Sequence, residues 1–297
     1  MTKYSRRHWL AFAAISPVLA VGGCTIASDY DHKSDDAPGF DATRAQPARM
    51  AWVLSSGGPR GFVHVGVLKA LDELGLKPDL VVGGSVGSLV GALYACGMPV
   101  VQIEAMALEL GITEMGRLAL CGEGRFSGNP IAEFINRQLN GRSIEQLPVR
   151  FAAAVLERQS RKPLLFNAGN AGLAVQASCA IEGTFTPVRI RSTQYVDPDM
   201  ATPLPVRLAR SLGAVKVLAV DASAHIDKAP VGAERFRQSD LAKRALVNAD
   251  AKLANLTLHP DFGYWVSPRQ EFRERAIRAG YEQTLARASE LKALHSL

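Results

Sequence analysis

The stretch from Ala51 to Met98 constrains the fold more than any other part of the chain. Apolar runs at residues 52–54 and 80–82 have the length of buried strands, and each run ends in a glycine-rich turn. Apolar residues at helical spacing follow each turn, and Gly75 occupies the position of a helix C-cap. This order of strand, turn and helix, repeated once, predicts two adjacent parallel strands and an α/β fold.

The second turn has the Gly-x-Ser-x-Gly form of a nucleophile elbow, with Ser85 at its centre. Such a turn pushes the serine hydroxyl clear of the backbone, and Gly83 and Gly87 let neighbouring chain pass close by. The helix that follows directs backbone N–H groups and its positive dipole end toward developing negative charge. Ser85 is therefore the candidate nucleophile.

The first turn combines three glycines with Pro59 and Arg60. Glycines allow backbone N–H groups to approach a tetrahedral oxyanion, and both turns are expected at the same edge of the sheet. A phosphate-binding loop is the alternative, although the turn lacks the Gly-Lys-Ser/Thr ending of a P-loop. Arg60 either orients this turn and meets an anionic headgroup, or forms an ion pair at the start of the helix.

These motifs together resemble the bacterial branch of the patatin-like phospholipase family. That family has a Gly-Gly-Gly-x-Arg-Gly oxyanion loop, a Gly-x-Ser-x-Gly elbow one βα unit later, and an Asp-Gly-Gly/Ala motif far downstream. In this chain Ser56 replaces the first glycine of the loop, and Glu182 stands where the family has proline. The resemblance spans residues 50–284 and includes the segments 174–185, 195–199, 203–205 and 277–281.

The resemblance implies a three-layer sandwich with a mostly parallel central sheet, and a serine acyl hydrolase that cleaves phospholipid or other fatty-acyl esters. It implies a catalytic dyad of Ser85 and Asp197 without histidine. Serine acyl transfer needs no metal or organic cofactor, so none is expected. Nucleic acid is not an expected partner, because the net charge of +6 is not arranged as a Lys/Arg stripe. The oxyanion hole implied by the family comprises Gly57, Gly58, Arg60 and Gly61.

The downstream motif departs from the family at its second and third positions, where Pro198 and Asp199 follow Asp197. Pro198 fixes φ at about −65° and has no N–H, and it favours extended backbone at the preceding residue. If the family turn needs a positive φ there, Asp197 is misaimed, and Asp199 compensates or the enzyme is weakened. Asp-Pro-Asp is also common turn chemistry, which is the alternative for this segment.

Two other functional interpretations stay open. An α/β-hydrolase triad is one, since His225 and His259 follow Asp197 in the order Ser–Asp–His, although that fold has several strands before its nucleophile. His64, on the first helix, is expected to be structural. The other is a catalytically weak or inactive lipoprotein of the same fold that binds lipid or a protein partner. A further option is an enzyme that transfers the acyl group to an acceptor other than water.

The N-terminus predicts export to the bacterial cell envelope. Residues 1–23 combine basic residues with an apolar run too short to span a membrane, as in a signal peptide. The segment 5–10 resembles a twin-arginine signal, and general secretory export is the alternative. Cys24 occupies the position of a lipobox cysteine, so we expect a lipid anchor there, or else an ordinary free thiol. Thr25 in place of aspartate favours the outer membrane, facing the periplasm.

The remainder divides into a spacer and one domain. Residues 24–47 are acidic and poor in apolar residues, which predicts a flexible tether, and residues 48–297 form the predicted patatin-like catalytic domain. Residues 215–220 are the strongest late strand, and residues 268–294 are expected to be helical. Three further cysteines, Cys96, Cys121 and Cys179, lack metal-ligand spacing and are expected to be thiols in the core. A disulfide that uses Cys121 stays open as an alternative.

Overall fold

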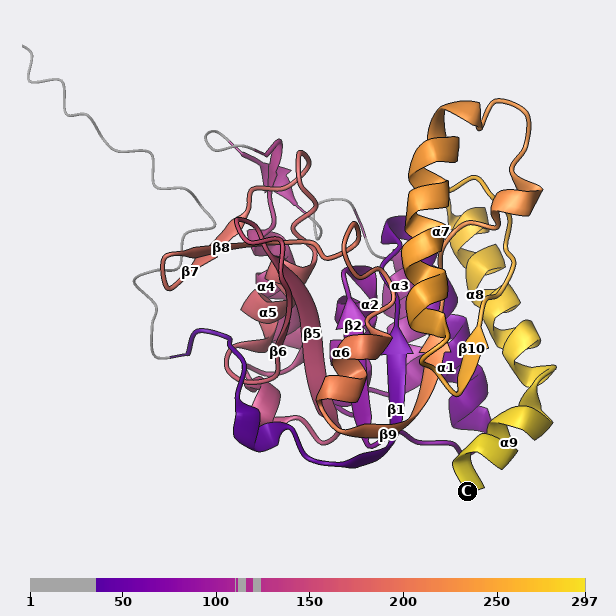
Figure 1. The fold of residues 1–297 in the computed structure, drawn as a ribbon, viewed down its shortest axis with the longest axis horizontal. Coiled ribbons are helices and arrows are strands. Elements are labelled where there is room, and N and C mark those ends of the chain that lie inside the picture. Colours follow the sequence, from indigo (N-terminus) through magenta and orange to yellow (C-terminus); the bar gives the residue numbers. More distant parts are fainter. Residues whose placement is uncertain (1–35, 110, 112–115, 120–123, 297) are drawn as a thin grey trace, which may run out of the picture.

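The computed structural model of the chain describes residues 36–109, 111, 116–119 and 124–296. These residues form a mostly parallel sheet between two layers of helices, which confirms the predicted α/β sandwich (Figure 1). The predicted signal peptide, Cys24 and Cys121 lie outside the described residues. The strands are β1 (Ala48–Leu54), β2 (Leu80–Gly84), β3 (Arg117–Leu118), β4 (Phe126–Ser127), β5 (Arg150–Glu157), β6 (Pro163–Phe166), β7 (Val188–Ile190), β8 (Thr193–Val196), β9 (Ala214–Val220) and β10 (Leu256–Leu258).

The main sheet has the order β10-β9-β1-β2-β5-β8-β7, and β6 also pairs with β5. The pairs from β10 to β5 are parallel, whereas β6, β7 and β8 join in antiparallel fashion. On β1, Trp52 lies opposite Val81 of β2 and Leu218 of β9. Because β1 and β2 are parallel neighbours, their glycine-rich turns leave the same edge of the sheet, which is the upper edge in Figure 1.

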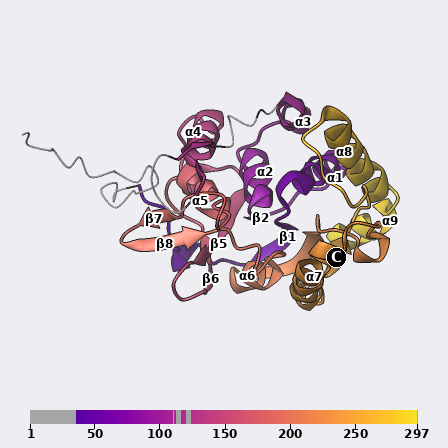
Figure 2. The same cartoon turned by 90° about the horizontal axis from the view of Figure 1, so that it is seen from above.

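Helices cover both faces of the sheet, with α6 and α7 on one side and α1, α2, α4, α5 and α8 on the other (Figure 2). The residues of β1 alternate between two apolar cores: Trp52 and Leu54 face the larger helical layer, and Ala51 and Val53 face the layer of α6 and α7. In the described ranges, no helix has the length and apolar character needed to cross a bilayer. The helices are α1 (Phe62–Glu73), α2 (Val86–Ala95), α3 (Val100–Glu109), α4 (Asn129–Gln138), α5 (Ala171–Ser178), α6 (Val206–Ser211), α7 (Arg237–Ala251), α8 (Gln270–Leu285) and α9 (Ala288–Ser296), with 3-10 turns at Ala42–Arg44, Gly58–Gly61, Ile144–Gln146, Ile226–Lys228 and Glu234–Phe236.

The helix predicted over residues 268–294 is in fact two helices, α8 and α9. The break between them lets α9 turn back toward the sheet, where Leu291 is fully buried and His295 Nε2 accepts a hydrogen bond from Trp52 Nε1 at 3.2 Å. The spacing of apolar residues is helical on both sides of the break. For this reason the sequence pattern did not reveal it.

Glycines let α8 lie directly against α1. A Cβ on Gly66 of α1 would lie 1.8 Å from the carbonyl oxygen of Ile277, and a Cβ on Gly280 of α8 would lie 2.3 Å from the carbonyl oxygen of Val63. Neither position can hold a side chain without separating the helices. The close crossing gives a structural reason for the segment 277–281, which the resemblance includes.

Residues 36–47 pack against the domain, although their composition suggests a free spacer. Gly39 and Ala168 exchange backbone hydrogen bonds, and the N–H of Asp41 donates to Oδ1 of Asn167 at 2.7 Å. Ala37 is only 6% exposed. The packed domain therefore includes residues 36–47 rather than starting at Ala48. Backbone hydrogen bonds make this contact, and composition cannot show them.

Candidate active site

Ser85 lies on the sharp turn between β2 and α2. Its backbone has φ 51° and ψ −126°, which a residue with a side chain adopts only under strain. The flanking glycines provide the space that the turn needs. A Cβ on Gly83 would lie 2.3 Å from the carbonyl oxygen of Gly87, and a Cβ on Gly87 would lie 2.3 Å from that of Leu54. The turn therefore has the geometry of a nucleophile elbow.

Two further serines hold this strained turn. The backbone N–H of Ser85 donates to Oγ of Ser178 at 2.8 Å, and that hydroxyl donates to the carbonyl of Ala154 on β5 at 2.6 Å. Ser88 Oγ donates to the carbonyl of Ser85 at 2.6 Å. Ser178 is not among the residues predicted for the site. Its signal was a serine that ends the apolar helix of residues 171–178.

The first glycine-rich turn lies directly beside the elbow. A Cβ on Gly61 would lie 2.3 Å from Cγ2 of Val86, the residue after Ser85. Gly58 adopts φ 53°, in the left-handed region that favours glycine. Within the described part of the chain, the N–H groups of Gly57 and Gly58 donate no hydrogen bond. These two donors are therefore available to an oxyanion at the elbow.

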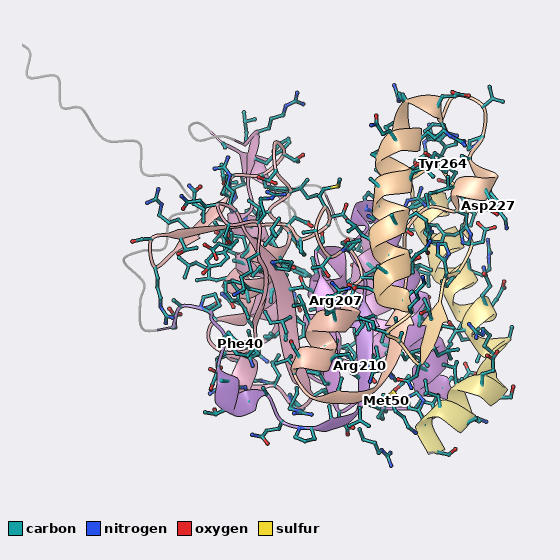
Figure 3. All side chains as sticks on the ribbon, in the orientation of Figure 1. Phe40, Met50, Arg207, Arg210, Asp227 and Tyr264 are labelled. Atoms are coloured by element: carbon teal, nitrogen blue, oxygen red, sulfur yellow. The ribbon has the colours of Figure 1, made fainter. Side chains whose placement is uncertain are left out.

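Arg60 does not join this donor set, which corrects its expected place in the oxyanion hole. Its backbone N–H donates to the carbonyl of Gly57 at 3.1 Å. Its guanidinium donates to the carbonyls of Gly263 and Tyr264 and lies over the rings of Phe262 and Tyr264. Tyr264 stands beside the upper end of α7, away from the sheet (Figure 3). Arg60 thus fastens the glycine turn to the loop after β10.

The carboxyl group of Asp197 comes to the elbow from the end of β8. Its backbone N–H donates to the carbonyl of Ala180, and its Oδ1 accepts the N–H of Asp199 at 2.8 Å. Oδ2 is buried and has no hydrogen-bond partner among the described residues. The hydroxyl of Ser85 lies close enough to interact with this carboxyl. With Pro198 as the next residue, the carboxyl of Asp197 still lies beside Ser85 and accepts the N–H of Asp199.

The surroundings of Asp197 make it a stronger base than a solvated carboxylate. Burial raises the pKa of Asp197 to about 7, although the Ser85 hydroxyl opposes this by hydrogen bonding. The neighbouring charge of Asp199 raises that pKa as well, and the charge of Lys243 lowers it. A group with a pKa near neutrality is ionised in part and still accepts a proton readily.

An apolar cavity of about 300 Å³ extends from Ser85 between α1, α2, α3 and α4. Residues of the first glycine turn line it together with Ser85, and most of its other lining side chains are aliphatic or aromatic. A cavity of this kind suits a hydrocarbon chain better than a polar ligand. Its wall includes Gly58, Pro59, Gly61, Phe62, Val65, Ser85, Val86, Leu89, Val90, Leu93, Ile103, Met106, Ala107, Ile131, Phe134, Cys179, Ile181 and Phe185.

The histidines of the alternative triad belong to a different cluster. His259 Nε2 lies 3.5 Å from the buried carboxylate of Asp221, and the ring of His225 stacks on His259 with 3.7 Å between centroids. Arg244 completes the cluster with Nη1 2.7 Å from Asp221. Among the described contacts, neither histidine has a hydrogen bond to Ser85. The triad thus has no structural counterpart at the elbow.

Two other predicted residues have structural environments. His64 is fully buried, its Nε2 donates to the carbonyl of Ser55 at 2.9 Å, and burial lowers its pKa to about 4. It is a neutral histidine that supports the first turn. Cys179 is a buried free thiol in the cavity wall, and Cys96 is a half-buried one. Within the described ranges, no three or more His, Cys, Asp or Glu side chains gather in a way that could hold a metal ion.

Comparison with known proteins identifies relatives of this site. Lysophospholipase NTE1 of Coccidioides immitis is 31% identical over 186 residues, covering 61% of this chain and 12% of that protein. Patatin-like phospholipase domain-containing protein 6 of Mus musculus is 31% identical over 180 residues, covering 58% and 13%. An uncharacterised NTE family protein of Mycobacterium bovis is 29% identical over 175 residues, covering 58% and 48%. The chain thus spans less than half the length of each of these relatives.

The fold has a counterpart among solved structures. The crystal structure of VipD from Legionella pneumophila matches with a TM-score of 0.54 and 16% sequence identity, covering 82% of this chain and 67% of that one. The family model for patatin-like phospholipase matches residues 52–210, more than half of the chain. That region contains both glycine turns, Ser85 and Asp197. With the fold, the elbow and this match in agreement, the chain belongs to the patatin-like phospholipase family.

Proposed function

We propose that this chain is a serine hydrolase of fatty-acyl esters, with Ser85 as nucleophile and Asp197 as its base. The observation that carries the proposal is the meeting of three features at one point. A strained elbow serine, a buried carboxyl with a pKa of about 7 and the mouth of an apolar cavity all lie together. Each feature has a separate role in acyl transfer.

In the proposed reaction, Asp197 accepts the proton of Ser85 Oγ as that oxygen attacks the ester carbonyl carbon. The N–H groups of Gly57 and Gly58 stabilise the oxyanion of the tetrahedral intermediate. Collapse of the intermediate breaks the ester C–O bond, and Asp197 returns the proton to the departing alcohol. Water then attacks the acyl-enzyme with the same base, which releases the fatty acid and restores Ser85.

The cavity accounts for the acyl part of the substrate. Its wall is almost entirely apolar, so the free energy of binding comes from the removal of hydrocarbon from water. The names of the relatives that match this chain include a lysophospholipase, which supports a lipid ester as substrate. We propose a phospholipid or lysophospholipid whose acyl chain enters the cavity and whose headgroup stays outside.

The test is hydrolysis of short- and long-chain p-nitrophenyl esters, with labelling by a fluorophosphonate probe that reacts with activated serines. We expect Ser85→Ala to lose both turnover and labelling. We expect Asp197→Asn to lose turnover by about 10³-fold or more, as for removal of a general base. Turnover that survives Asp197→Asn moves the base to another group. A folded wild type without turnover or labelling favours the lipid-binding alternative.

We also propose that Cys24 carries a lipid that holds the domain at the envelope, on the lipobox-like sequence before it. A chain anchored in this way reaches membrane lipids without diffusing through the periplasm. The test is metabolic labelling with an alkyne fatty acid, followed by separation of inner and outer membranes. Label absent from wild type, or retained in Cys24→Ser, contradicts the proposal.

A further inference from the structure

Lys243 of α7 reaches the active-site edge of the sheet through one ion pair. Its Nζ lies 2.5 Å from Oδ1 of Asp199, with only 18% of the Lys243 side chain exposed. The hydroxyl of Ser56 donates to the same oxygen. Asp199 is thus held by two contacts: the ion pair with Lys243 of α7, and the hydrogen bond from Ser56, which lies two residues after β1.

Asp199 connects these contacts to the base. Its backbone N–H donates to Oδ1 of Asp197 at 2.8 Å, and this is the hydrogen bond that orients that carboxyl. On the other side, Ser56 precedes Gly57 directly, and the backbone N–H of Ser56 donates to the carbonyl of Pro203 at 2.8 Å. The hydrogen bond from Ser56 to Asp199 therefore joins the loop of Asp197 to the glycine turn, and the ion pair with Lys243 ties that loop to α7.

We propose that Lys243 and Asp199 are positioning residues, which hold Asp197 against Ser85 and set the pH range in which Asp197 accepts its proton. The inference rests on the proposed function and adds residues that the family motifs do not contain. Both Ser56 and Asp199 stand where the resembling family has small residues, and the structure joins them to each other. The two residues that differ from the family motifs, Ser56 and Asp199, therefore act together.

The charges near Asp197 determine in which direction each substitution moves the pKa of that group. Asp199 raises the pKa of Asp197 and Lys243 lowers it, while burial is the largest cause and raises it. Among the described residues Cys179 is a further ionisable neighbour, a buried thiol whose own pKa is raised by burial and by Asp197, so it stays neutral. Loss of Lys243 and loss of the Asp199 charge therefore act in opposite directions on the same base.

The experiment measures kcat/KM against pH for a short-chain ester in wild type, Lys243→Met and Asp199→Asn. Activity requires ionised Asp197, so it rises with pH through the pKa of that group. We expect the acid limb of Lys243→Met to move to higher pH, with an about threefold loss at pH 6 for an upward shift of about half a unit. We expect the acid limb of Asp199→Asn to move to lower pH.

Opposite movements distinguish electrostatic positioning from simple loss of packing, which lowers activity at every pH alike. Lys243→Arg keeps the charge and is expected to restore the wild-type limb. Lys252→Met is the matched control, because it removes a cation beyond the end of the same helix on an exposed residue. If Lys243→Met does not fold, Asp199→Asn alone decides, since an unmoved or upward-moving limb overturns the inference.

The result separates this inference from the proposed function. Turnover that survives in Ser85→Ala contradicts the serine mechanism itself. Turnover lost in Ser85→Ala and Asp197→Asn, with acid limbs unmoved in Lys243→Met and Asp199→Asn, contradicts only the role of the ion pair. Limbs that move in the same direction in both variants contradict it equally.

Discussion

The backbone N–H of Ser85 donates a hydrogen bond to the hydroxyl of Ser178, a residue 93 positions further along the chain, with 2.8 Å between the two atoms. Ser178 passes the contact on to β5 by donating to the carbonyl of Ala154. The strained backbone of the elbow is therefore held from α5 and from the neighbouring strand. Strain of this kind persists only where surrounding contacts fix it.

Ser178→Ala is expected to loosen the elbow. The variant leaves the buried N–H of Ser85 without a partner, which costs about 1–3 kcal/mol of folding free energy. Under the proposed function, turnover is expected to fall more than stability alone explains, because Ser85 loses its fixed direction. Urea unfolding and ester hydrolysis measure the two effects. Ser211→Ala, which removes an exposed hydroxyl from α6, is the control and is expected to change neither. Wild-type turnover in Ser178→Ala contradicts this role.

The crossing of α1 and α8 gives a prediction about stability alone. Gly280→Ala places a methyl group within 2.3 Å of the carbonyl oxygen of Val63, so α8 must move away from α1. Overpacking of this kind costs about 1–3 kcal/mol or more. The measurement is the midpoint of thermal unfolding, with exposed Arg278→Ala on the same helix as control. An unchanged midpoint in Gly280→Ala is inconsistent with the close crossing.

Local sequence patterns predicted the two glycine-rich turns that meet at Ser85. The glycines that flank Ser85 and those in the turn before α1 can be recognised in the sequence, because the backbone approaches so closely there that no other residue fits. The same patterns did not indicate how Arg60 is held, because its guanidinium has partners on a loop 203 and 204 residues away. Ser178 was missed for the same reason, since a contact between distant segments leaves no periodic signal in either one.

The residues that differ from the family motif were the hardest to interpret from the sequence alone. Pro198 and Asp199 suggested that Asp197 is misaimed, and only the structure shows that Asp199 donates its N–H to Asp197 while Ser56 and Lys243 contact Asp199. Glu182, which replaces a proline, lies at the surface and pairs with Arg161 at 2.7 Å. Each substitution has a partner that a single sequence does not connect to it.

Asp197 is expected to make the folded protein less stable as the pH rises. An acid with a raised folded-state pKa binds more protons folded than unfolded between pH 4 and 7, so stability falls across that window. The slope is at most about 1.4 kcal/mol per pH unit for one group. Asp197→Asn removes this slope, and its unfolding midpoint at pH 8 is expected to exceed that of wild type.

The control for this experiment is Asp227→Asn, an exposed carboxyl on the outer loop shown in Figure 3. It is expected to leave the pH dependence of unfolding unchanged. The comparison uses differential scanning calorimetry at pH 5 and pH 8. If wild type and Asp197→Asn lose stability equally between these values, the carboxyl of Asp197 is not the perturbed group.

A substitution in the cluster around Asp221 tests whether His259 has a structural or a catalytic role. His259→Gln removes a partner of a carboxylate that is 1% exposed, and Arg244 remains to pair with it. We expect a lower unfolding midpoint, but fluorophosphonate labelling within about threefold of wild type per folded molecule, because a lost triad histidine costs far more. Labelling reduced by 10³-fold would restore the triad with His259 as its base.

Under the proposed function, the apolar cavity predicts a preference for the length of the acyl chain. Ala107 of α3 lies in its wall, so Ala107→Trp fills part of the space that a long acyl chain occupies. The ratio of kcat/KM for a long-chain ester to that for a butyrate ester is expected to fall about tenfold, since a few displaced methylenes are worth 1–3 kcal/mol in an apolar pocket. Val101→Trp adds the same side chain to an outward position of α3 that is 65% exposed, and it should leave the ratio unchanged. A ratio that falls equally in both variants would show that the added indole acts on α3 and not on the cavity. An unchanged ratio in folded Ala107→Trp would place the acyl chain elsewhere on the protein.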